Sequence, residues 1–154
     1  MSLKLALAPL AAAVCLFAAE KYTGPIPPKP DIPYLLHASN LLETEPAQAH
    51  EGKRDTFVIS GAASPARTPL AEPIFILDAR QLSPETIELY RLDLKGGNRE
   101  LSFTSGRHGG RSLHLTVRPL TGHLYRLEAD EPLENGEYAL SPNGSNQSFC
   151  FEIY

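Results

Sequence analysis

Residues 149–154, Phe-Cys-Phe-Glu-Ile-Tyr, alternate apolar side chains at odd positions with Cys, Glu and Tyr at even positions. Such a period of two predicts a β-strand that packs one face on a core, because successive side chains point to opposite sides of a sheet. Residues 113–118 repeat the pattern, with Leu113, Leu115 and Val117 on one face. Tyr125 and Leu127 share a face in a further expected strand. We therefore expect antiparallel pairing in the C-terminal part of the chain.

Short runs of the same kind extend through the rest of the sequence. The 14 Pro and 11 Gly in 154 residues argue against a helical bundle. We expect strands over residues 34–42, 56–60, 73–78, 86–94 and 99–104, a loop over 43–55 and one helical turn at 83–85. The segment Lys95-Gly96-Gly97-Asn98 predicts a tight hairpin turn. About eight or nine short strands at this spacing indicate an all-β chain folded as an antiparallel β-sandwich.

The segment Leu133-Glu-Asn-Gly-Glu-Tyr-Ala-Leu140 resembles the turn that leads into the penultimate strand of immunoglobulin-like and fibronectin-type-III-like sandwiches. The resemblance covers about the last twenty residues, and the chain has no Trp and no Cys pair of the immunoglobulin kind. It implies that Tyr138 forms a tyrosine corner, in which the hydroxyl bonds back to the chain a few residues upstream. Leu133 then precedes the turn. The expected fold is an immunoglobulin-like sandwich.

The N-terminus differs in composition from the rest of the chain. Residues 1–19 hold one Lys followed by an apolar run that ends in small residues, which predicts a signal peptide and a periplasmic or secreted bacterial protein. Cys15 offers lipidation as an alternative, and only lipidation or an uncleaved signal would attach the chain to a membrane. Residues 20–33 are rich in Pro and predict an extended leader. The sandwich domain is expected over residues 34–154, with Cys150 as its one thiol.

Metal binding and catalysis have weak support in the sequence. No His-x-His, Cys-x2-Cys or Gly-x-Ser-x-Gly motif is present. His108, His114 and His123 fall on neighbouring predicted hairpins, so a copper or zinc site at one end of the sandwich is an alternative. Otherwise we expect no metal and no cofactor. A hydrolase that uses loop carboxylates is a third hypothesis.

Positive charge is concentrated in residues 91–126, which carry seven Lys and Arg against two acidic residues. Strands that follow one another usually pair, so this segment predicts a basic face. Arg107, Arg111 and Arg118 are the candidate anion-binding residues, for an anionic glycan, a lipid surface or an acidic protein. The alternative is internal balance by the acidic residues at 128–137. The net charge of −4 gives no reason to expect nucleic-acid binding.

Together these features favour an exported, non-enzymatic module that binds or supports an unidentified partner. An extracytoplasmic metal-binding domain is the alternative.

Overall fold

The structure, a computed structural model, describes residues 21–103 and 110–154. The predicted signal peptide with Cys15, and the candidate residues Arg107 and His108, lie outside the described residues. Within them, no helix has the length and hydropathy needed to cross a membrane.

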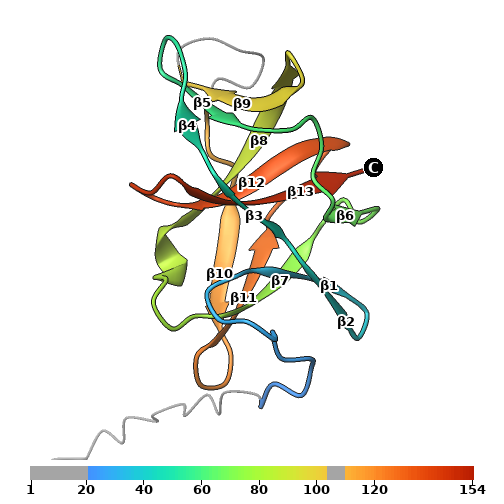
Figure 1. The fold of residues 1–154 in the computed structure, drawn as a ribbon. Helices are drawn as coiled ribbons and strands as arrows, with labels where there is room; N and C mark the ends of the chain where they lie inside the picture. Colours follow the sequence, from blue (N-terminus) through green and yellow to red (C-terminus); the bar gives the residue numbers. More distant parts are fainter. Residues whose placement is uncertain (1–20, 104–109) are drawn as a thin grey trace, which may run out of the picture.

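The regular structure of the described residues is almost entirely β-strand, as the sequence predicts (Figure 1). A single 3-10 turn, η1, covers Pro84–Thr86 at the expected place. The strands are β1 (Tyr34–His37), β2 (Asn40–Glu43), β3 (Glu45–Gln48), β4 (His50–Glu51), β5 (Thr56–Ile59), β6 (Arg67–Thr68), β7 (Ile74–Asp78), β8 (Ile87–Lys95), β9 (Asn98–Ser102), β10 (Leu115–Pro119), β11 (Leu124–Ala129), β12 (Gly136–Pro142) and β13 (Gln147–Ile153).

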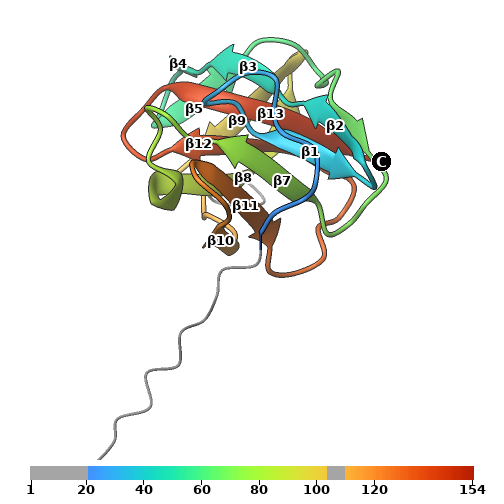
Figure 2. The same cartoon turned by 90° about the horizontal axis from the view of Figure 1, so that it is seen from below.

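The strands form two sheets. The first is five-stranded in the order β10-β11-β7-β1-β2, and the second runs β3-β13-β12-β8-β9-β5-β4, with β6 beside β13. Every pairing is antiparallel except the short one between β6 and β13. The first sheet stacks on the part of the second that holds β12 and β13, while β4, β5 and β9 extend beyond it (Figures 1 and 2). The all-β, sandwich-like architecture is confirmed.

The core between the two sheets is apolar and aromatic. The ring of Phe151 lies 5.0 Å from that of Phe75 across the layers and stacks on Tyr138 at 5.5 Å. Phe149, Phe151 and Ile153 of β13 all face this core, so the alternation expected in this segment is confirmed. Burial of aromatic rings of this size supplies a large part of the hydrophobic stabilisation of a small domain.

The second sheet curls around on itself, and we call it the curled sheet. Its two ends in the strand order, β3 and β4, are consecutive in the chain and are separated only by Ala49. The amide of Ala49 donates to the carbonyl of Asn146, which continues the pairing beyond β3. The other face of β12 and β13 therefore faces an interior of its own. Ala139 and Cys150 lie in this second cluster of buried residues.

Two expected elements differ from the structure. Residues 34–42 do not form one strand, because the chain turns back at Ala38, whose φ is +54°. Residues 43–55, expected as a loop, contain β3 and β4. Their inward positions are Glu45, Ala47 and Ala49, which have too little apolar character for the pattern to indicate a strand. The hairpin at Gly96 and Gly97 is as predicted, and both residues have positive φ.

The leader lies along the first sheet. The Tyr22 amide donates to the hydroxyl of Thr121, and the Asp31 amide donates to the carbonyl of Asp78 in β7. Residues 21–33 contain no strand in this structure.

Candidate functional site

The two described histidines of the metal hypothesis, His114 and His123, lie far apart. His114 immediately precedes β10, and His123 lies in the turn between β10 and β11. They therefore sit at opposite ends of a five-residue strand, which spans about 13 Å, far more than one ion can bridge. Among the described residues, no group of three or more His, Cys, Asp or Glu side chains has the arrangement of a metal site. The separation concerns His114 and His123, since His108 lies outside the described residues.

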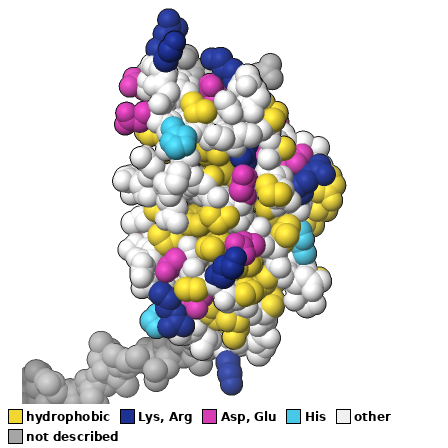
Figure 3. Space-filling view, in the orientation of Figure 1, with side chains coloured by type: hydrophobic (Ala, Val, Ile, Leu, Met, Phe, Trp, Pro, Cys, Tyr) yellow, Lys and Arg dark blue, Asp and Glu magenta, His cyan; other side chains and the backbone are white. Residues whose placement is uncertain are grey.

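The described basic residues of 91–126 do not form one face. Arg99 has no exposed surface at all, because it points into the curled sheet. Arg91 pairs with Glu134 at 2.6 Å, and Lys95 lies 3.8 Å from Glu100. On the face shown in Figure 3, Lys and Arg side chains are scattered among acidic ones.

Arg118 is exposed on β10 and lies opposite Arg126 on β11. The shallow depression between them is also lined by Glu72, Glu128 and Asp130, and Glu128 forms an ion pair with Arg126. Arg111 is exposed beyond the end of β9. Internal balance by the acidic residues at 128–137 therefore accounts for part of the segment's charge.

Tyr138 and Leu133 occupy the positions that the resemblance implies. The Tyr138 hydroxyl donates to the carbonyl of Glu134 at 2.7 Å, four residues upstream. Both side chains belong to the core between the sheets. Burial is the main cause of the raised pKa of Tyr138, so the phenol stays protonated and able to donate this hydrogen bond.

The curled sheet encloses a hollow of about 300 Å³, which has no counterpart in the sequence-based predictions. It is open at one end, which we call the mouth. On β12 and β13, and at Ala49 between β3 and β4, small residues face it, whereas large residues face it on β5, β8 and β9 and at Phe103 just after β9. The small set is Ala49, Ala139, Ser141 and Ser148; the large set is Phe57, Ile59, Tyr90, Leu92, Leu101 and Phe103. Because small side chains face large ones, the interior is not filled.

The opposite end of the curled sheet is closed by Arg99. Its Nη atoms donate to both carboxylate oxygens of Glu45, at 2.6 and 3.0 Å, and to the carbonyl of Ser60 at 2.9 Å. Its Nε donates to the carbonyl of Gly61, and Glu137 lies 3.7 Å away. This network provides the buried guanidinium with four hydrogen bonds and a second carboxylate nearby.

Between this network and the hollow lies Cys150, which is fully buried. Removal from water raises the pKa of its thiol to about 12, although Arg99 lowers it. The thiol therefore remains protonated and unreactive at neutral pH, since the thiolate is the nucleophile.

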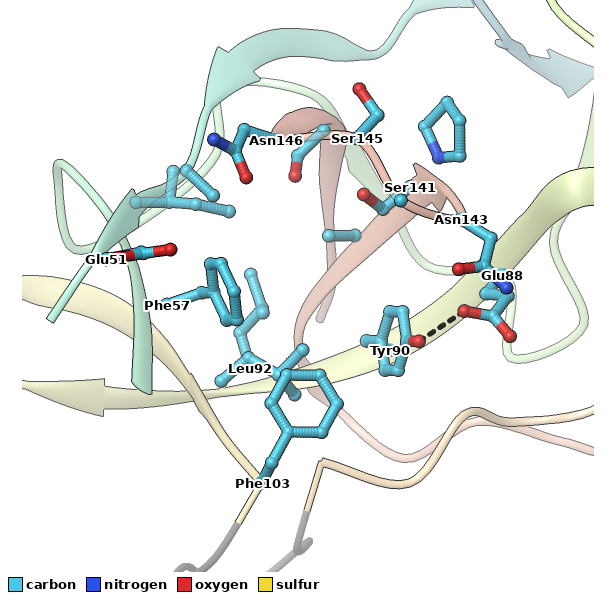
Figure 4. A pocket seen from close by; sticks show the side chains of 17 residues that line it. Glu51, Phe57, Glu88, Tyr90, Leu92, Phe103, Ser141, Asn143, Ser145 and Asn146 are labelled. Atoms are coloured by element: carbon cyan, nitrogen blue, oxygen red, sulfur yellow. Dashed lines mark hydrogen bonds between the residues drawn. The ribbon is translucent and has the colours of Figure 1, made fainter. Parts of the chain in front are cut away.

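The mouth of the hollow combines aromatic rings with polar groups (Figure 4). Phe57, Tyr90 and Phe103 lie on one side. The opposite side is formed by the β12–β13 turn, including Asn143 and Asn146.

Two carboxylates, Glu51 and Glu88, stand at separate positions around the opening (Figure 4). The hydroxyl of Tyr90 donates to Glu88. Within the described part of the chain, no His, Lys or Arg lines the hollow. This arrangement suits non-covalent binding of a small molecule.

One signal in the sequence points to this site. In β12 and β13, the segments Tyr-Ala-Leu-Ser and Ser-Phe-Cys-Phe place large residues at one parity and small ones at the other. Both faces of these two strands are largely buried, and the face with the small residues borders the hollow. Comparisons with protein-family models, curated proteins and solved structures find no match to this chain, so the geometry of the hollow guides the functional proposal.

Proposed function

We propose that this chain is an exported, non-enzymatic binding module and that the hollow of the curled sheet is its ligand site. The observation that carries the proposal is the hollow itself, about 300 Å³ in volume and lined by aromatic rings with a few polar groups. Ligand sites in proteins are concave and mostly apolar, with a small number of placed polar groups that fix orientation. The predicted signal peptide supports a role in the periplasm or outside the cell.

The polar groups at the mouth are held by the backbone. The Ser141 hydroxyl donates to the carbonyl of Gln147 at 2.7 Å, and the hydroxyl of Ser145 accepts from the amide of Gln147 at 3.1 Å. The Asn143 amide donates to the carbonyl of Thr86 at 2.8 Å. A turn fixed in this way is preorganised, which lowers the entropic cost of binding.

A fragment screen on the purified, isotope-labelled protein tests the proposal. We expect small molecules that shift the amide resonances of residues 143–146 and of β5, which border the hollow. Phe103 is 46% exposed, so Phe103→Ala removes a ring from the mouth without removing a core side chain. It should weaken binding of such a fragment roughly five- to tenfold, since aromatic contacts contribute about 1 kcal/mol and 1.4 kcal/mol is tenfold.

Tyr154→Ala is the matched control. Tyr154 is an aromatic residue of similar exposure, 52%, but its ring stacks under Arg67 and lies outside the hollow. This variant should bind fragments as the unaltered protein does. A screen of neutral, cationic and anionic fragments that shifts no resonance around the hollow would refute the proposed site.

A further inference from the structure

The charge around the hollow selects between classes of ligand. Glu51 and Glu88 are the charged side chains among its described lining residues, and both are acidic. Among the described lining residues, an anion would meet two carboxylates at the opening and no cation, whereas a cation would be attracted by both.

The three rings at the mouth are arranged so that they do not stack on one another. Phe57 and Phe103 have centroids 5.8 Å apart with their planes at 88°, and Tyr90 and Phe103 are 6.3 Å apart at 79°. All three rings line the hollow. A cation within about 6 Å of an aromatic centroid is attracted by the negative face of the ring.

Tyr90 is tied to one of the carboxylates. Its hydroxyl donates to Glu88, so the position of the ring and the position of the acid are set together. Burial, followed by this contact with Glu88, raises the pKa of Tyr90, and the phenol remains neutral at physiological pH. The ring thus offers a π face and its neighbour offers a full negative charge.

We propose that the hollow binds a small organic cation, with a substituted ammonium group near the rings of Phe57, Tyr90 and Phe103. Glu51 and Glu88 balance its charge from the opening. The serine and asparagine groups of the β12–β13 turn are placed to bond a hydroxyl or other polar group elsewhere on the ligand. This inference rests on the proposed function and adds the chemical class of the ligand.

Choline and 3,3-dimethylbutan-1-ol form a suitable pair of probes, because they share one shape and differ in having a quaternary nitrogen or a quaternary carbon. We expect choline to bind at least tenfold more tightly, as measured by titration of the amide resonances around the hollow. The double variant Glu51→Gln and Glu88→Gln should reduce this preference severalfold, because the alcohol carries no charge for the carboxylates to attract.

Glu131→Gln is the matched control, since Glu131 is exposed and lies outside the hollow. It removes one negative charge where the double variant removes two, so twice its effect on the binding of choline is what net charge alone accounts for. Added salt should weaken the binding of choline more than that of the alcohol, because screening acts only on the charged ligand.

The possible failures are distinguishable. If the alcohol binds at the hollow as tightly as choline, the ligand is not selected by charge; the cation inference is overturned and the binding function stands. If neither compound shifts the lining resonances, the cation inference is overturned as well. The fragment screen then decides whether the hollow binds neutral molecules or no small molecule at all.

Discussion

Replacement of Arg99 by Met tests the account of how the curled sheet is closed. Arg99 is the largest fully buried side chain, and it makes four hydrogen bonds, two of them to Glu45. Met has a similar reach but no charge, so the variant leaves the carboxylates of Glu45 and Glu137 without their cation. Breaking a buried ion pair from one side costs about 3–5 kcal/mol.

This loss should be measured as the free energy of unfolding in urea and as a melting temperature. For a domain of this size, each kcal/mol corresponds to roughly 4 °C, so we expect the melting temperature to fall by about 12–20 °C at neutral pH. Arg67→Met is the control. Arg67 also forms a bidentate pair, with Glu152, but its side chain is 51% exposed, whereas that of Arg99 is 0% exposed. The control should lose far less stability, because a solvent-exposed ion pair contributes little.

The loss of unfolding free energy in Arg99→Met should also depend on pH. Burial raises the pKa of Glu137 above 4.5, while the Ser64 amide and Arg99 lower it. Without Arg99 the pKa of Glu137 in the folded protein rises further. Between the unfolded and folded values, the folded variant then binds a proton that the unfolded chain does not bind, so folding is favoured as the pH falls. The difference in free energy of unfolding between Arg99→Met and the unaltered protein should therefore become smaller from pH 7 toward pH 5.

Two results would contradict this reasoning. An Arg99→Met variant with the stability of the Arg67→Met control would show that the network contributes little. If the difference in free energy of unfolding between Arg99→Met and the unaltered protein stays constant between pH 7 and pH 5, Glu137 is not left as an unpaired buried charge in the variant.

Two further predictions concern residues near the core. Tyr138→Phe removes the 2.7 Å hydrogen bond to the carbonyl of Glu134 and should lower the free energy of unfolding in urea by about 1 kcal/mol. A loss near zero would show that this hydrogen bond does not stabilise the fold. Cys150 should resist thiol reagents in the folded protein and react fully in denaturant, because it is buried and its pKa is about 12. Rapid labelling under native conditions would show that the curled sheet opens.

The local pattern of the sequence was enough to predict most strands. The hairpin at Gly96 and Gly97 follows from turn chemistry, and the buried face of residues 149–153 follows from a period of two. The tyrosine corner contact of Tyr138 follows from a short motif. Each of these features depends on residues that are close together in the chain.

The predictions failed where a residue's environment is set by distant parts of the chain. Glu45 looks like a loop residue because it is charged, yet it lies on a strand and pairs with Arg99, which is 54 residues away. Arg99 was counted as part of a basic surface and is fully buried. A charged side chain is buried only where an oppositely charged partner and carbonyl acceptors surround it. These groups come from distant parts of the chain, so the local sequence pattern does not predict them.

The sequence by itself determined the class of fold, the positions of most strands and the parity of their buried faces, because these depend on side-chain alternation and turn residues. Only the tertiary structure decided that the second sheet curls until β3 and β4 join through Ala49. That curl turns the small face of β12 and β13 toward the large residues of β5, β8 and β9. The hollow exists because side chains from six strands leave it unfilled, and its shape is a property of their arrangement in space.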